Sequence, residues 1–376
     1  NPILPKEKDF DVKGEITAFD PSPDGKKLAF VSRGELFVSD VEGKFIRQLN
    51  RHSAERVTEV AWMADSRRLL FTQTLHGYTN LYVMAADSAG LPQAITRDAR
   101  NNRSMVYNKT RSMAVYLSGR DQVRLLDTKT LESKTIARDE LWAFQNSNPG
   151  FSPNDEYVLF TAYRDFEQDI MVYRIQDGKL MNLTNTGITE SDPYWSGDGK
   201  YIYFTSQRLK PAYPFGMANS KVYRIALDKL DEPFRSDKYN ELFKDEKKDE
   251  KKEEKKEEKK DSARKTPPLK PITINLDGMM DRVEQISPNL GGQSLEFVYQ
   301  KGEKTTVLYS SNHDQGRFAL WKTVLEPFEA NKTDRLAGTD GNAGFGIRET
   351  GDKLYLLVNG GIARLNLDGS KVDPIS

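Results

Sequence analysis

The stretch Ser22-Pro-Asp-Gly-Lys-Lys-Leu-Ala-Phe30 is a polar turn that leads into an apolar strand, and the chain repeats this pattern. Close copies are Ser152-Pro-Asn-Asp-Glu-Tyr-Val-Leu-Phe160 and Ser196-Gly-Asp-Gly-Lys-Tyr-Ile-Tyr-Phe204. The seven copies end at the apolar anchors Phe30, Phe71, Tyr116, Phe160, Phe204, Phe297 and Leu356. The first five anchors are 41, 45, 44 and 44 residues apart. A period of about 40–50 residues is typical of one supersecondary unit that stacks on copies of itself.

Each unit contains the signals of four short antiparallel strands. An innermost strand such as Val57–Trp62 precedes the turn, and an outer strand such as Phe45–Leu49 completes the unit. β-Branched and aromatic residues dominate these runs, and Asp-Gly turns suit tight hairpins. Four such strands in about 44 residues make a propeller blade. The sequence therefore predicts an all-β fold, a single seven-bladed β-propeller of four-stranded antiparallel blades over residues 1–376. The expected blades are approximately 15–50, 56–97, 103–138, 145–184, 190–232, 271–330 and 335–376.

The spacing breaks once, between Phe204 and Phe297, which are 93 residues apart. Within this interval, residues 244–260 are all charged, nine of them Lys and eight Asp or Glu. Such a run has no apolar side chain to bury. We therefore expect residues 233–270 to form a long, charged, disordered insertion. The alternative is an electrostatic arm that binds a partner.

The overall charge is balanced, with 56 Lys and Arg against 56 Asp and Glu. No net field would attract nucleic acid or an anionic membrane, so neither is an expected partner. The chain has no Cys, and no apolar run approaches the roughly 18 residues that span a bilayer. It begins at Asn1-Pro2-Ile3 without an initiator Met or a signal-like segment, so we expect a processed product or a fragment.

Residues that could carry catalysis are few. Only His52, His76 and His313 are available as imidazole bases, and none has an obvious Ser or Cys partner in its own motif. The segment Gly292-Gln-Ser294-Leu-Glu296 lacks the final Gly of a GxSxG nucleophile motif, and we interpret it as a turn. No residue is therefore assigned a catalytic role.

No metal or cofactor site is predicted. Clusters such as Pro153-Asn-Asp-Glu156 lack the ligand spacing of a calcium-binding loop, and hairpin turns account for them. The Gly-rich segment Gly341–Gly346 is not followed by a helix that would present amides to a phosphate. Trp62 and Trp195 occupy equivalent positions in two units, where packing between blades explains them.

One set of polar residues recurs at a shared position. Counting three residues back from the Trp62 and Trp195 position gives Glu59, Ser104, Asn148 and Asp192. If the innermost strands share a register, these side chains face the same way. Two interpretations remain open, a polar ring that faces the propeller axis and ordinary solvation of the propeller mouth.

The repeats resemble the WD40-like PD40 repeats of TolB, of prolyl oligopeptidase-type propellers and of tricorn-type proteases. Longer segments are similar to the second, seven-bladed propeller of tricorn proteases. These segments are Phe10–Glu15, Ser236–Asn240 and Pro271-Ile-Thr-Ile-Asn-Leu-Asp277-Gly-Met-Met-Asp281-Arg282. The last of them resembles the segment that leads into the sixth blade in that family.

The resemblance implies a noncatalytic propeller that gates or filters peptides for a serine-peptidase core outside this segment. The full-length parent would be a peptidase, and the segment alone would not. Its partners would be peptides, the other domains of the parent and further copies of the full-length protein, in the cytoplasm or alternatively the periplasm. Alternatives are a TolB-like interaction propeller and the propeller of a prolyl oligopeptidase-type hydrolase. The family's ring is similar to an open one, and pairing of Phe10–Val12 with the seventh blade would close it.

Overall fold

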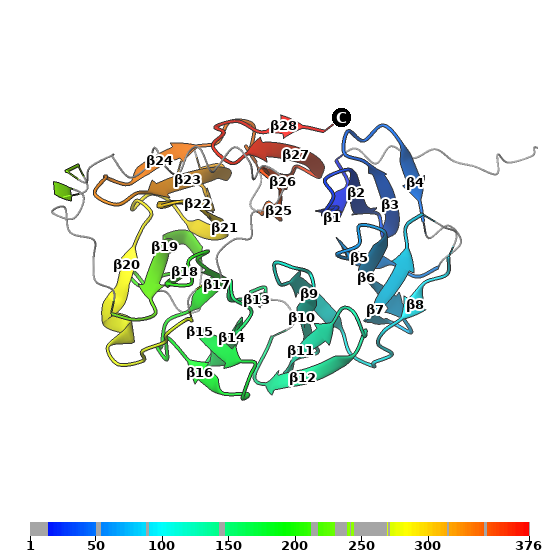
Figure 1. Ribbon diagram of the computed structural model, residues 1–376, viewed down its shortest axis with the longest axis horizontal. Coiled ribbons are helices and arrows are strands. Elements are labelled where there is room, and N and C mark those ends of the chain that lie inside the picture. The colour runs from blue at the N-terminus through cyan, green and yellow to red at the C-terminus, as the bar shows by residue number, and fades with distance from the viewer. Residues whose placement is uncertain are drawn as a thin grey trace, which may run out of the picture.

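The computed structural model describes residues 14–49, 54–87, 90–142, 147–211, 217–229, 239–240, 242–243, 269, 271–313, 316–341 and 344–375. They form seven antiparallel sheets of four strands each, arranged in a ring (Figure 1). The predicted seven-bladed β-propeller is confirmed. Within the described residues, no helix is long and apolar enough to cross a membrane.

The first four blades follow one another without interruption. Blade one contains β1 (Ile16–Pro21), β2 (Lys27–Ser32), β3 (Glu35–Asp40) and β4 (Ile46–Gln48). Blade two contains β5 (Val57–Trp62), β6 (Arg68–Leu75), β7 (Tyr78–Ala85) and β8 (Gln93–Ala94). Blade three contains β9 (Asn102–Tyr107), β10 (Met113–Ser118), β11 (Gln122–Asp127) and β12 (Ser133–Arg138). Blade four contains β13 (Gly150–Phe151), β14 (Tyr157–Arg164), β15 (Glu167–Arg174) and β16 (Leu180–Asn182).

The remaining blades complete the ring. Blade five contains β17 (Glu190–Trp195), β18 (Tyr201–Ser206), β19 (Lys221–Ala226) and β20 (Val283–Gln285), with the 3₁₀ turns η1 (Met217–Asn219) and η4 (Met279–Arg282). Blade six contains β21 (Gln293–Lys301), β22 (Lys304–Ser311), β23 (Ala319–Leu325) and β24 (Lys332–Arg335). Blade seven contains β25 (Arg348–Thr350), β26 (Lys353–Val358), β27 (Gly361–Asn366) and β28 (Asp373–Pro374).

The apolar core is divided among the interfaces between blades, with one buried cluster at each of the seven. Trp62 belongs to the cluster between blades one and two, and Trp195 to the cluster between blades four and five. The prediction that both Trp side chains pack between blades is confirmed. A four-stranded sheet has apolar residues on both faces here, so a blade is stable only between two neighbours.

The fifth blade corrects the sequence-based boundaries at 190–232 and 271–330. Strand β20 pairs with β19, although Val283–Gln285 follows the insertion. Met279 of η4 is buried in the cluster between blades four and five. The insertion therefore interrupts blade five between its third and fourth strands, because the edge of β19 is paired by this later segment. A three-residue strand is too short for periodicity to reveal. Residues 233–270 themselves lie almost wholly outside the described residues.

Blades seven and one meet through side chains. All four strands of blade seven come from the C-terminal part of the chain, and its cluster with blade one includes Phe19, Phe30 and Tyr355. The N–H of Ile16 donates to the carbonyl of Gly360 at 3.0 Å. Among the described residues, closure thus involves packing without a borrowed strand. The predicted pairing of Phe10–Val12 lies outside the described residues.

Strand direction separates the connections onto two faces of the ring. Turns between first and second strands lie on one face, together with the connection from third to fourth strands. The hairpins between second and third strands, and the links between blades, lie on the other. We call this second face the linker face. The described ends of the connection between β19 and β20, which contains the insertion, lie on the opposite face.

A buried ion pair joins the first three blades. Arg111, in the turn between β9 and β10, donates from Nη1 to Asp20 Oδ2 at 2.6 Å and to the Trp62 carbonyl at 2.5 Å. The Asp20 side chain is 2% exposed and also accepts the Trp62 N–H at 2.7 Å. A carboxylate this deep in the protein depends on its cation, since an unpaired buried charge is costly.

We expect Arg111→Ala to destabilise the propeller by about 3–5 kcal/mol, because it leaves the Asp20 carboxylate buried without its cation. The measurement is the midpoint of urea unfolding. Lys109→Ala removes a charge from an exposed residue of the same turn and serves as the control. Equal midpoints for the two variants would show that the pair contributes no net stability.

Candidate axial site

The innermost strands of the seven sheets surround the axis of the ring (Figure 1). Three of the four residues predicted to face the axis lie in these innermost strands, at or next to β-bulges. Glu59 lies in β5, Ser104 in β9 and Asp192 in β17, and all three are partly exposed. Asn148 is exposed and precedes β13. That the four side chains line a channel stays a prediction.

Glu59 and Ser104 are brought together across the interface between blades two and three. Glu59 accepts the N–H of Met105 at 3.3 Å and is also bonded by the N–H of Ser104. Ser104 has a φ of 57° in a bulge that turns its backbone toward the neighbouring blade. Burial raises the pKa of Glu59, against the opposing effect of these N–H groups and of the charge of Arg348 in blade seven.

Asp192 connects three blades. Its φ is 52°, again within a bulge, and its N–H donates to Ser147 Oγ of the link into blade four at 2.8 Å. Its Oδ2 accepts the hydroxyl of Ser294 of blade six at 3.0 Å. Burial raises the pKa of Asp192, while the hydroxyls of Ser294 and Thr205 act in the other direction. The contact to blade four comes from Ser147, the neighbour of the predicted Asn148.

Glu296 is a further member that the sequence interpretation missed. The segment read as a turn is part of the long strand β21, which contains both Ser294 and Glu296. Glu296 Oε2 accepts the N–H of Phe345 in blade seven at 3.2 Å. Burial raises the pKa of Glu296 to about 8, and the nearby charge of Asp192 adds to the rise. Its signal was a lone acidic residue between the apolar Leu295 and Phe297 of this strand.

We call Glu59, Asp192 and Glu296 the axial carboxylates. Each hydrogen-bonds the blade that follows its own, so they hold neighbouring innermost strands together. Burial raises the pKa of all three, and with a pKa of about 8 Glu296 is mostly neutral at pH 7. The arrangement provides hydrogen bonds and titratable groups, among them the contact of the Ser294 hydroxyl with the Asp192 carboxylate.

The histidines differ in their surroundings. His76 lies in the hairpin between β6 and β7, and His52 lies outside the described residues. His313 does have a serine partner, contrary to the sequence interpretation, because its Nδ1 lies 3.0 Å from Ser311 Oγ. Ser311 is fully buried, so a substrate could not reach its hydroxyl. Within the described ranges, no group of three or more His, Cys, Asp or Glu converges as a metal site.

Comparison with known proteins assigns a family. Residues 16–342 match the family described as the tricorn protease second beta propeller domain. Among solved structures, the crystal structure of the tricorn protease aligns with a TM-score of 0.66 and 16% identity, over 96% of this chain and 34% of that chain. This chain thus spans about a third of that protein. No curated protein matches.

Two solved TolB structures align less well. The putative TolB from Agrobacterium tumefaciens has a TM-score of 0.41 and 17% identity, over 57% of this chain and 78% of that chain. TolB from Acinetobacter baumannii has a TM-score of 0.42 and 16% identity, over 83% of this chain and 66% of that chain.

We expect stability to depend on the protonation of Glu296. Its folded pKa of about 8 exceeds its usual 4.5, so its contribution is complete below about pH 4.5 and is lost as pH rises through about 8. Glu296→Gln keeps an acceptor for Phe345 and cannot ionise. The Tm of this variant should exceed that of the parent at pH 9 and match it at pH 4. Each kcal/mol of difference in the free energy of unfolding should change Tm by about 2–4 °C.

The matched control is Glu329→Gln, an exposed residue before β24, whose effect should be small at both pH values. A Glu296→Gln variant that shifts Tm equally at pH 4 and pH 9 would contradict the assigned ionisation.

Proposed function

Because the chain belongs to the tricorn protease second beta propeller domain family, we propose that it is the noncatalytic propeller of a tricorn-like serine peptidase. In this proposal it filters peptides on their way to a catalytic core in another part of the protein. The observation that carries the proposal is the family match over residues 16–342, which includes all or part of every blade except the seventh.

The axis is the proposed route. Its walls are the innermost strands, and their exposed or half-buried residues include Glu59, Asp192, Arg348 and Glu349. The charge of Arg348 in β25 lowers the pKa of Glu59 in β5, so charged groups of different blades interact near the axis. A peptide on this route would lose hydrogen bonds to water and would form hydrogen bonds to acidic and basic side chains instead. An extended, unfolded chain has its backbone N–H and C=O groups free for these contacts, whereas a folded chain does not.

The remaining domains of the parent and further copies of the full-length protein are the proposed structural partners, and peptides are the proposed substrates. We propose a cytoplasmic location for the parent, with the periplasm as the alternative. Cell fractionation with a periplasmic marker tests this placement, and recovery in the periplasmic fraction would contradict it.

The filter is tested in the full-length protein with the double substitution Thr58→Trp and Arg348→Trp. Both residues are exposed on innermost strands, and in this proposal we expect Trp side chains there to narrow the axis, at the loss of the Thr58 hydroxyl contact with Thr72. We expect kcat/KM for a long unstructured peptide to fall about tenfold, equivalent to about 1.4 kcal/mol. The rate for a dipeptide-sized reporter should be nearly unchanged.

The control places two Trp residues on outermost strands, with Lys134→Trp and Lys332→Trp. These substitutions should leave both rates near those of the parent. An equal loss for long and short substrates, or a loss in the control, would argue against an axial route.

The 376-residue chain alone should hydrolyse no peptide, because its described Ser–His contact has a buried serine. Product release is followed by mass spectrometry with the purified chain and with His76→Ala and His313→Ala variants. Hydrolysis that persists through repurification, whether or not these variants abolish it, would contradict a noncatalytic role.

A further inference from the structure

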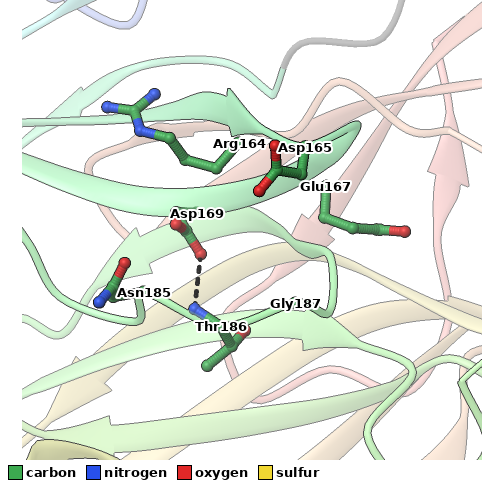
Figure 2. Close-up of a pocket in the computed structure, with 7 residues that line it drawn as sticks. All are labelled: Arg164, Asp165, Glu167, Asp169, Asn185, Thr186 and Gly187. Carbon is green, nitrogen blue, oxygen red and sulfur yellow. Dashed lines mark hydrogen bonds between the residues drawn. The ribbon is translucent and has the colours of Figure 1, made fainter.

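Blade four carries a cavity of about 430 Å³ on the linker face. Two segments form it, the tip of the hairpin between β14 and β15 and the link from β16 to β17. Figure 2 shows the Asp169 carboxylate hydrogen-bonded to Thr186, the Asp165 carboxylate turned toward the same side, and Glu167 extending away from both. The lining residues are Arg164, Asp165, Glu167, Asp169, Asn185, Thr186 and Gly187.

The residues that line this cavity carry a net negative charge. It contains three carboxylates and one guanidinium. That guanidinium is already paired, since Arg164 donates to both oxygens of Asp139, at 2.6 and 2.9 Å. A fourth carboxylate, Glu190, lies directly behind and accepts the hydroxyl of Thr186 at 2.9 Å. Arg208 faces Glu190 at 3.3 Å, so the three lining carboxylates remain in excess.

The fold does not require a charge at Asp169. Its Oδ1 accepts the Thr184 hydroxyl and the Thr186 N–H, both at 3.1 Å. In blade two the neutral Asn80 makes the same two contacts, to the Thr96 hydroxyl at 2.9 Å and to the Asp98 N–H at 2.7 Å. The equivalent turn therefore forms with an amide, and the carboxylate of blade four is a charge beyond what the turn needs.

The groups that donate hydrogen bonds to the Asp169 carboxylate are all neutral. Asp169 is 1% exposed, and its other oxygen accepts the amide of Asn182 at 2.8 Å. A carboxylate buried among neutral donors at the wall of a cavity attracts a cation into that cavity, since the low-polarity surroundings screen it weakly.

Gly187 keeps the cavity open. Its φ lies outside the left-handed region, and a Cβ built there meets nothing within 4 Å. Neither the backbone nor the packing therefore calls for glycine, and a side chain at this position would occupy the empty space.

A metal ion does not suit this cavity, because no metal-type ligand cluster forms among the residues the structure describes. The volume fits a group of side-chain size, within the range of pockets that enclose small organic ligands. We propose that this cavity binds the cationic group of a peptide, an ammonium or guanidinium, beside Asp165 and Glu167, with the buried Asp169 attracting it from behind the wall. The inference rests on the proposed function only for the source of the ligand, since a peptide filter meets such groups continually.

The test is an NMR titration of the chain, followed at the Thr186 amide. The probes are a blocked pentapeptide with a central lysine, the same peptide with norleucine, and pentaglycine with a free amino terminus. We expect a saturable shift with lysine and none with norleucine. A shift with free-amino pentaglycine alone would support the site with a terminal ammonium as its ligand. No shift with either cationic probe would overturn the proposal.

Three variants examine the lining. Asp165→Asn with Glu167→Gln should weaken binding about tenfold, as should Asp169→Asn, which reproduces the Asn80 turn of blade two. Gly187→Leu should abolish binding with Tm unchanged, because its side chain fills open space. The matched control is Glu156→Gln, an exposed carboxylate on the opposite face of blade four.

If Glu156→Gln weakened binding of the lysine peptide as much as the lining variants, the overall charge of the protein would explain the effect, and the proposed site would be overturned. Undiminished binding by Gly187→Leu would also overturn the site. Because the titration measures equilibrium binding at blade four and involves no hydrolysis, its failure is separate from a failure of the axial filter.

Discussion

Every blade depends on the burial of apolar side chains against the next blade around the ring. A sheet that is apolar on both faces cannot be stable alone in water, so the seven clusters between blades are the condition for all the rest. The interface between blades seven and one obeys the same rule, with Phe19, Phe30 and Tyr355 in its cluster. Packing, with the hydrogen bond from Ile16 to Gly360 and the ion pair of Arg364 with Glu42, thus joins the two ends of the described chain into a ring.

Hydrogen bonds between neighbouring innermost strands supplement this apolar packing. Near the axis the innermost strands converge, and bulges at Ser104 and Asp192 turn backbone groups toward neighbouring blades. Glu59 accepts N–H groups of the Ser104 bulge, and the Asp192 N–H donates to the Ser147 hydroxyl, while burial raises the pKa values of the axial carboxylates. A residue that looks like a functional group in the sequence therefore also has a structural role. This dual role is why a polar ring alone does not identify a channel.

The two proposals concern different parts of the molecule. The axial filter involves all seven blades and follows from family membership and ring geometry. The cavity of blade four involves one hairpin and one link, and follows from an excess of charge that the equivalent turn of blade two does without.

Periodicity in the sequence was sufficient for the propeller, the number of blades and the packing of Trp62 and Trp195, because each follows from local strand and turn signals repeated at a fixed spacing. That Glu59, Ser104, Asn148 and Asp192 face a channel stays a prediction. Periodicity could not place β20, whose three residues pair with β19 across the insertion, or connect Glu296 to Phe345. Those contacts join residues far apart in the chain, and only the folded ring brings them within hydrogen-bonding distance. The same holds for the cavity, since its charge balance depends on which carboxylates find a cation in space.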